Sequence, residues 1–148
     1  MPTINTTVDI DAPRADVWQT LTDFDAYGEW NPHLTAVEGT LTEGGALDVR
    51  VERAGAKPRE LTVTLTDVDR GRRLVWVGTV AFGSLFEGRH VFELEPLAGN
   101  RTRLHNREDV SGLLAGRLVT ATPERDYEAM NEALKRRVES RLPEPEAS

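Results

Sequence analysis

The first ten residues alternate between apolar and polar side chains, which is typical of a strand with one buried face. One face of this segment carries Ile4, Thr6, Val8 and Ile10. Pro13 interrupts the alternation and suits the first position of a helix. The apolar side chains that follow, Val17, Trp18 and Leu21, recur at helical spacing. We therefore predict a strand over 4–10, a helix from Pro13, and broken helical turns in the aromatic stretch 23–32.

Six further segments alternate with a period of two, and residues typical of turns separate them. They cover 35–41, 47–51, 61–66, 74–80, 86–95 and 101–110. Gly44-Gly45 and Gly71 mark two of the turns, and residues 96–100 form a predicted five-residue hairpin loop. Short turns between successive strands predict an antiparallel sheet.

The last third of the chain changes to helical periodicity. Tyr127, Met130, Leu134 and Val138 form an apolar stripe, with Thr122 as predicted N-cap and a shorter helical piece over 113–119. The pattern predicts an α+β fold, with a seven-stranded curved antiparallel sheet covered by this long C-terminal helix. We expect one domain over residues 1–142 and a disordered tail over 143–148.

The five-residue loop sets a predicted register for the hairpin 86–110. It places Glu95 opposite Arg101 and Glu93 opposite Arg103, as ion pairs on the outer face of the sheet. The alternation then sends the side chains of the intervening positions inward, toward the space under the helix.

Three polar residues fall on that inward face: His90, Asn106 and Glu108. An unpaired carboxylate in a sealed core costs several kcal/mol, so these groups either satisfy one another or face a wet cavity. Three interpretations stay open: a structural polar cluster, a site that orients a ligand, or a catalytic dyad of His90 and Glu108.

Composition and motifs exclude several kinds of chemistry. A net charge of -7 and a pI near 5 argue against nucleic-acid binding. The absence of cysteine excludes disulfides and thiolate metal sites. His33, His90 and His105 have no metal-ligand spacing, and no Gly-rich phosphate loop occurs, so we expect neither a metal nor another cofactor. No signal peptide or membrane span is evident, so we expect a cytoplasmic protein that is not integral to a membrane.

Most of the chain resembles a known superfamily. The matching runs are APRADVW (12–18), LTDFDAY (21–27), WNP (30–32), GGAL (44–47), RLVWVG (73–78), GRHVF (88–92), TRL (102–104), EDVSGLL (108–114) and MNEALK (130–135). These runs resemble the START-like, or Bet v 1-like, superfamily, and are most similar to its polyketide cyclase/dehydrase-type (SRPBCC) branch.

The resemblance implies a helix-grip fold: the curved sheet wraps the C-terminal helix, two short helices follow the first strand, and a deep apolar cavity lies between. The superfamily includes lipid carriers, aromatase/cyclases and chaperone activators, and its catalytic residues differ between branches. None is therefore transferred to this chain.

The sequence is compatible with three functions. The first is binding of a small hydrophobic or amphipathic ligand such as a lipid, polyketide or aromatic. The second is a cyclase- or dehydratase-like enzyme in which His90 and Glu108 transfer protons, and Asn106 bonds a substrate carbonyl. The third is an interaction module like the chaperone activators. A homodimer is left open. The predicted ligand contacts are Tyr27, Trp30, Trp76, Phe86, His90, Phe92, Asn106, Glu108, Leu113, Met130 and Leu134.

Overall fold

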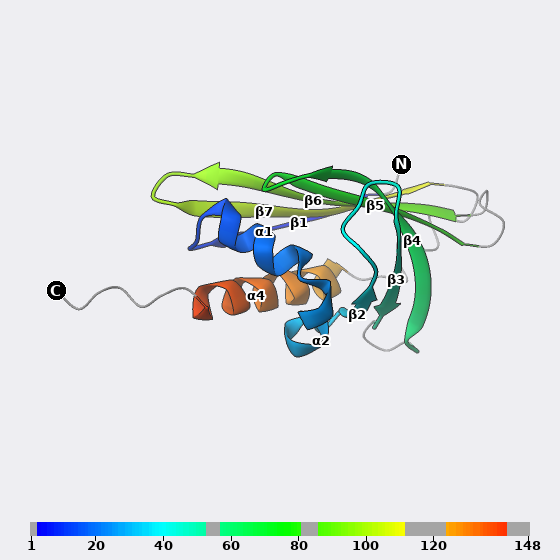
Figure 1. Cartoon of the computed structure of the whole chain (residues 1–148). Coiled ribbons are helices and arrows are strands. Elements are labelled where there is room, and N and C mark those ends of the chain that lie inside the picture. The colour runs from blue at the N-terminus through cyan, green and yellow to red at the C-terminus, as the bar shows by residue number, and fades with distance from the viewer. Residues whose placement is uncertain (1–2, 53–56, 81–85, 112–123, 142–148) are drawn as a thin grey trace.

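The computed structural model describes residues 3–52, 57–80, 86–111 and 124–141. One antiparallel sheet of seven strands curves over helix α4, and helices α1 and α2 lie beside α4 on the same side of the sheet (Figure 1). The strand order is β1-β7-β6-β5-β4-β3-β2, so β1 and β2 are the edges. The predicted α+β fold, with its curved sheet and long C-terminal helix, is confirmed.

The element boundaries follow the sequence pattern closely. The strands are β1 (Thr3–Ile10), β2 (Leu34–Glu38), β3 (Ala46–Val51), β4 (Arg59–Asp69), β5 (Arg73–Val80), β6 (Phe86–Leu97) and β7 (Arg101–Ser111). The helices are α1 (Arg14–Thr22), the 3-10 turn η1 (Phe24–Ala26), α2 (Tyr27–Trp30) and α4 (Glu124–Ser140). Pro13 is the N-cap of α1 rather than its first residue. The helix predicted over 113–119, the cap at Thr122 and the tail 143–148 lie outside the described residues.

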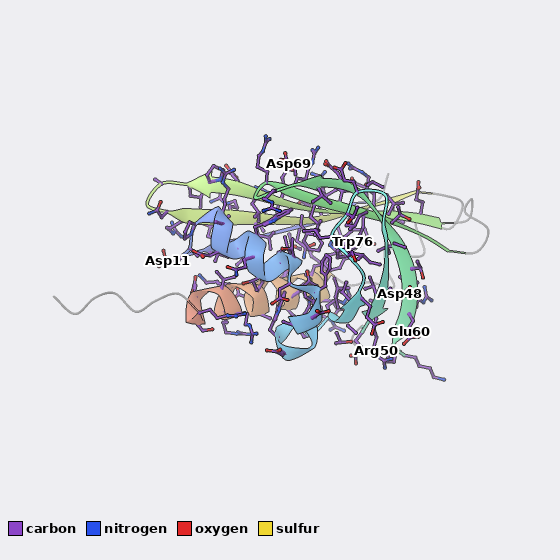
Figure 2. The ribbon with its side chains drawn as sticks, viewed as in Figure 1. Asp11, Asp48, Arg50, Glu60, Asp69 and Trp76 are labelled. Carbon is purple, nitrogen blue, oxygen red and sulfur yellow. The ribbon has the colours of Figure 1, made fainter. Side chains whose placement is uncertain are left out.

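Alternation along the strands separates the two faces of the sheet. On β3, Leu47 and Val49 are buried while Asp48 and Arg50 are exposed. Trp76 on β5 points toward the helices, whereas Asp69 lies on the outer side of the sheet (Figure 2). Burial of the inner face against α1 and α4 supplies the main apolar stabilisation of the fold.

The hairpin between β6 and β7 is tighter than predicted. Leu97 pairs with Arg101, so the loop is the three residues 98–100 rather than five. Gly99 and Asn100 both have positive φ, at 77° and 58°, and these left-handed conformations let a three-residue loop close the hairpin. The correction moves the pairing by two positions, which leaves every side chain on its predicted face.

The predicted ion pairs of that hairpin are therefore wrong. Glu95 lies opposite Arg103, and Glu93 opposite His105. Arg103 instead binds Asp9 of β1, with Nε 2.8 Å from Oδ1. Glu95 accepts from His105 at 2.9 Å. These pairs lie at the surface and contribute little to stability.

Helix α4 is fastened along the edge strand β1. Its apolar stripe is buried in the core, as the helical spacing predicts, and includes Met130 and Leu134. Lys135 Nζ donates to the carbonyl oxygen of Asp9 at 3.0 Å, and Glu139 Oε2 accepts from the backbone N–H of Asp11 at 2.8 Å. The first strand and the last helix are thus joined by polar contacts as well as by packing.

Gly39 ends β2 at a place where only glycine fits. Its φ is 145°, and a Cβ added there would lie 2.5 Å from Leu47 Cδ2 and 2.7 Å from the carbonyl oxygen of Ala46. Gly44 also has positive φ, at 84°, but nothing lies within 4 Å of its added Cβ. An alanine at Gly39 would meet both conformational strain and steric overlap, whereas an alanine at Gly44 would meet conformational strain alone.

We predict that Gly39→Ala lowers the free energy of unfolding by about 3 kcal/mol, because strain and overlap both apply. The matched control Gly44→Ala meets only the conformational penalty, about 1 kcal/mol. Urea denaturation of the two variants and the wild type measures both values. Equal losses for the two variants would contradict the predicted contact with Leu47.

Candidate functional site

Strands β6 and β7 bring the inward polar residues together. His90 pairs with Glu108 across the two strands, and Asn106 lies next to them opposite Phe92. His90 is 4% exposed and Asn106 is fully buried, while the Glu108 side chain is 18% exposed. The sequence prediction that His90 lies near both Asn106 and Glu108 is confirmed, although the register that led to it differs by two positions.

The His90 imidazole is surrounded by aromatic rings. It stacks on Phe92 with centroids 4.2 Å apart, and Trp76 approaches edge-on at 5.4 Å. Tyr127 of α4 lies at 5.2 Å. These contacts keep the ring in one orientation and keep water away from its faces.

One hydrogen bond defines the chemistry of this imidazole. His90 Nε2 lies 2.6 Å from Asn106 Oδ1. Burial lowers the pKa of His90 to about 4, and the bond to Asn106 only partly opposes that shift. The ring is therefore neutral near pH 7, with Nε2 donating to the amide oxygen. Nδ1 is then an unprotonated acceptor, 3.8 Å from Glu108 Oε2 and beyond hydrogen-bond distance.

Glu108 has the opposite electrostatic response. Burial raises the pKa of its carboxyl, and the hydroxyl of Tyr127, which hydrogen-bonds to it, opposes part of that rise. Burial also raises the pKa of Tyr127 well above 10, so Tyr127 stays a neutral donor. A carboxyl that holds its proton more tightly, beside an imidazole that releases its proton more easily, is an arrangement suited to acid–base chemistry.

His33 is a member of this cluster that the sequence analysis missed. It precedes β2, is 3% exposed, and packs its ring against Tyr127 at 5.1 Å. Its Nδ1 lies 2.8 Å from the carbonyl oxygen of Glu52, to which it donates, so Nε2 is left as a second bare acceptor. Burial lowers the pKa of His33 as well. No sequence signal connects three segments this far apart, because only the folded sheet brings them together.

Asn106 is not free to hydrogen-bond a substrate carbonyl, contrary to the expectation from the sequence. Its Oδ1 bonds His90, and its Nδ2 donates to Asn131 Oδ1 at 2.8 Å. Both ends of the amide are engaged within the protein, so the predicted bond to a substrate carbonyl has no free group on Asn106. The amide orients the imidazole instead.

The predicted aromatic wall of the site is partly core. Tyr27 is fully buried, its hydroxyl donates to the carbonyl oxygen of Leu21, and its ring packs edge-on against Trp30. Trp30 is only partly buried, and its buried Nε1 has no hydrogen-bond partner. Both lie on α2, one of the short helical turns predicted over 23–32. Trp30 is therefore the better placed of the two to meet a ligand.

The other predicted contacts that the structure describes are buried in the core. Phe92, Met130 and Leu134 are 0% exposed, and Trp76 is 4% exposed. A ligand that touches the first three needs the surrounding core to open, so their roles stay predictions. The side chain of Phe86 and all of Leu113 lie outside the described residues.

Four surface hollows are lined by described residues, and the cluster lies outside them. The largest of four, about 550 Å³, lies along the edge strand β1 and is also lined by Arg103 of β7 and Lys135 of α4. None of these four includes His90, Glu108 or Tyr127. Within the described part of the chain, no three His, Asp or Glu side chains meet closely enough to hold a metal ion. The internal cavity stays a prediction from the sequence and the family.

The curved seven-stranded sheet around α4 is a START-like fold. Residues 1–139 match the family described as polyketide cyclase / dehydrase and lipid transport, and the chain belongs to that family. A sequence search of curated proteins returned no match.

Solved structures share the fold at low sequence identity. The Zhui aromatase/cyclase from Streptomyces has a TM-score of 0.78 at 20% identity, with 97% of this chain and 96% of that chain covered. A START superfamily protein from Mycobacterium smegmatis has 0.74 at 21%, with 95% and 99% covered. Norcoclaurine synthase from Thalictrum flavum, solved with dopamine and hydroxybenzaldehyde, has 0.74 at 13%, with 97% and 89% covered. The helix-grip fold implied by the sequence resemblance is thereby confirmed.

No helix in the described part of the chain combines the length and apolarity needed to cross a bilayer. The cytoplasmic location, the homodimer and the domain limit at residue 142 stay predictions.

We predict that protonation of His90 destabilises the fold. Its pKa is about 4 when folded and 6.5 when unfolded, so its contribution is complete above pH 6.5 and is lost as the pH falls toward 4. The loss is up to about 3 kcal/mol of unfolding free energy. Glu108 acts in the opposite sense, since its raised pKa makes ionisation unfavourable as the pH rises.

The quantity to measure is therefore the difference in unfolding free energy between the wild type and a variant without His90. Urea denaturation of wild type and His90→Phe between pH 4 and 7 isolates the histidine, because Glu108 contributes to both proteins. The wild type should lose stability relative to the variant as the pH falls. A constant difference across this range would rule out a buried neutral His90.

Proposed function

We propose that this protein binds a small hydrophobic or amphipathic molecule, of lipid, polyketide or aromatic type, between the sheet and α4. The polar end of the ligand meets His90, Glu108 and Tyr127. The observation that carries the proposal is a largely buried carboxyl beside a neutral imidazole whose Nδ1 is bare. Pockets for organic ligands combine apolar walls with a few convergent polar groups of this kind.

The energetics favour a site over a purely structural cluster. Glu108 has the Tyr127 hydroxyl as a hydrogen-bond donor and no fixed cation within 4 Å among the described residues. Burying a carboxyl under those conditions destabilises the fold, and replacing such groups with apolar ones is often stabilising. Buried groups with shifted pKa values are concentrated at binding and catalytic sites, where the shift serves the chemistry.

The relatives support an organic ligand without naming it. The family description joins cyclase/dehydrase activity with lipid transport. Norcoclaurine synthase, which shares the fold, was solved with two aromatic molecules bound. That analogy and the aromatic rings around His90 favour an aromatic ligand.

Proton transfer is the second candidate function, and the opposed pKa shifts of His90 and Glu108 favour it. In this reaction, His90 Nδ1 removes a proton from the carbon next to a ketone, and protonated Glu108 donates a proton to the ketone oxygen. The product is the enol, and the reverse steps return both protons. No metal or other cofactor takes part.

We predict that the purified protein binds 2-naphthol more tightly than naphthalene, since only the former donates a hydroxyl to His90 Nδ1. His90→Phe keeps the aromatic packing and should weaken 2-naphthol binding about tenfold, while naphthalene binding changes little. Fluorescence titration gives both dissociation constants.

Asp109→Asn is the control for a substitution on β7 outside the cluster, because Asp109 follows Glu108 and points to the opposite face, where it pairs with Arg89 and Arg107. It should leave both affinities unchanged within about twofold. Failure of both probes to bind, or equal losses for both in His90→Phe, would remove the proposal.

We predict that the protein accelerates the exchange of protons for deuterium at the carbons next to the ketone of 2-tetralone, a bicyclic aromatic ketone, in heavy water. His90→Phe should reduce the acceleration by about 100-fold, and Glu108→Gln comparably, as expected for loss of a general base or acid. The rate should fall as the pH rises through the raised pKa of Glu108, because the acid form is consumed. Proton NMR follows the exchange, and a wild-type rate equal to buffer alone would exclude this second function.

A further inference from the structure

Behind His90 lies a chain of three buried polar side chains from three different elements. Asn106 of β7 donates from Nδ2 to Asn131 Oδ1 of α4, at 2.8 Å. Asn131 Nδ2 donates to Thr6 Oγ1 of β1, also at 2.8 Å. Thr6 Oγ1 donates to the backbone carbonyl oxygen of Asn106, at 3.0 Å. All three residues are at most 5% exposed, so these bonds have no competition from water.

The chain has a fixed direction because it ends on a backbone carbonyl. A carbonyl oxygen can only accept, so the Thr6 hydroxyl must donate to it and accept from Asn131. The Asn131 NH₂ group therefore faces Thr6, and its Oδ1 faces Asn106. The Asn106 NH₂ group must then face Asn131, which turns Asn106 Oδ1 toward His90.

A second contact fixes the same amide orientation. The sulfur of Met130 lies 3.9 Å from Asn106 Nδ2 and accepts a weak hydrogen bond from it. Rotating the Asn106 amide by half a turn would set its oxygen against this sulfur and against Asn131 Oδ1. Acceptors would then face acceptors, and the Asn106 NH₂ group would face His90.

We infer that Thr6 and Asn131 are positioning residues that hold His90 as the Nε2–H tautomer and so keep its Nδ1 bare beside Glu108. The inference deepens the proposed function, since it explains why the site presents an acceptor nitrogen to a ligand. Neither residue touches Nδ1, and both act through Asn106. Without the Thr6 hydroxyl the two amides can rotate together, which places the His90 proton on Nδ1, facing Glu108.

The tautomer can be read directly from ¹⁵N-labelled histidine by long-range ¹H–¹⁵N NMR at pH 7, with His90→Phe to assign the signals. The wild type should show a protonated Nε2 and an unprotonated Nδ1 on His90. Thr6→Val removes the hydroxyl at nearly constant shape and should lower the ratio of Nε2–H to Nδ1–H about tenfold or more. Thr6→Ser restores the hydroxyl and should restore the wild-type spectrum.

Thr102→Val is the matched control. Thr102 is also a buried strand threonine, and its Oγ1 donates to a backbone carbonyl, that of Ala12, at 2.8 Å. Thr102 lies four residues before Asn106 on β7 and makes no hydrogen bond to Asn106, Asn131 or Thr6. Removing its hydroxyl should therefore leave the His90 tautomer unchanged. A Thr6→Val spectrum like the wild type, or an equal shift in Thr102→Val, would overturn the inference.

If Thr6→Val does not fold, the wild-type spectrum alone is decisive, because Nδ1–H on His90 contradicts the chain of donors. Thr6→Ala then replaces the valine variant, with the same expectation. These measurements use the protein without ligand. If wild-type His90 is the Nε2–H tautomer but the protein does not bind 2-naphthol, the result counts against the proposed function only. If wild-type His90 is a mixture of both tautomers and the protein still prefers 2-naphthol to naphthalene, the result counts against the positioning role only.

Discussion

The burial of a carboxyl beside an imidazole is the constraint on which the rest of this structure depends. Glu108 and His90 lie where apolar side chains would be more stable, so the surrounding structure has to supply their hydrogen bonds. Tyr127 supplies one, and Asn106 supplies another. Each of these partners comes from an element that must be in place before the cluster is satisfied. The site and the fold are therefore stabilised by the same set of contacts.

Position on the sheet decides which residues can join the cluster. β6 and β7 are interior strands of the sheet, so their inward side chains are covered by α4 and by neighbouring rings. The outward residues of the same strands form solvated ion pairs, as Arg103 and Asp9 do. One residue of offset along a strand separates the two environments, which is why adjacent Glu108 and Asp109 differ so much in their surroundings.

The sequence alone predicted the fold and the polar cluster on the inner face of the sheet, because alternation places the strand side chains and helical spacing identifies α4. His90, Asn106 and Glu108 share a face in any register that differs by an even number of positions, so the wrong loop length did no harm. That length was not predictable from pattern, because the left-handed conformations of Gly99 and Asn100 are properties of the folded loop.

Two residues of the cluster and its support, His33 and Asn131, were not predicted from the sequence, for two different reasons. His33 reaches the cluster only through the curvature of the sheet, which no local pattern encodes. Asn131 did carry a signal: its spacing from Tyr127 and Leu134 puts it in the apolar stripe of α4, where an amide is out of place. A polar residue in such a stripe, together with Thr6 in the apolar face of the first strand, is the sequence signal that would have pointed to these hydrogen bonds.

The attachment of α4 along β1 has a consequence for synthesis. β1 pairs with β7, about a hundred residues later in the chain, and Asp9 bonds Lys135, which is later still. While a ribosome makes this chain from its amino end, the first strand therefore waits without its neighbours, exposing apolar side chains and unpaired backbone groups. Contacts this distant in sequence are slow to form and vulnerable to mispairing. The nascent protein thus passes through an interval in which protection by a chaperone is most valuable, and this interval ends when the last helix emerges.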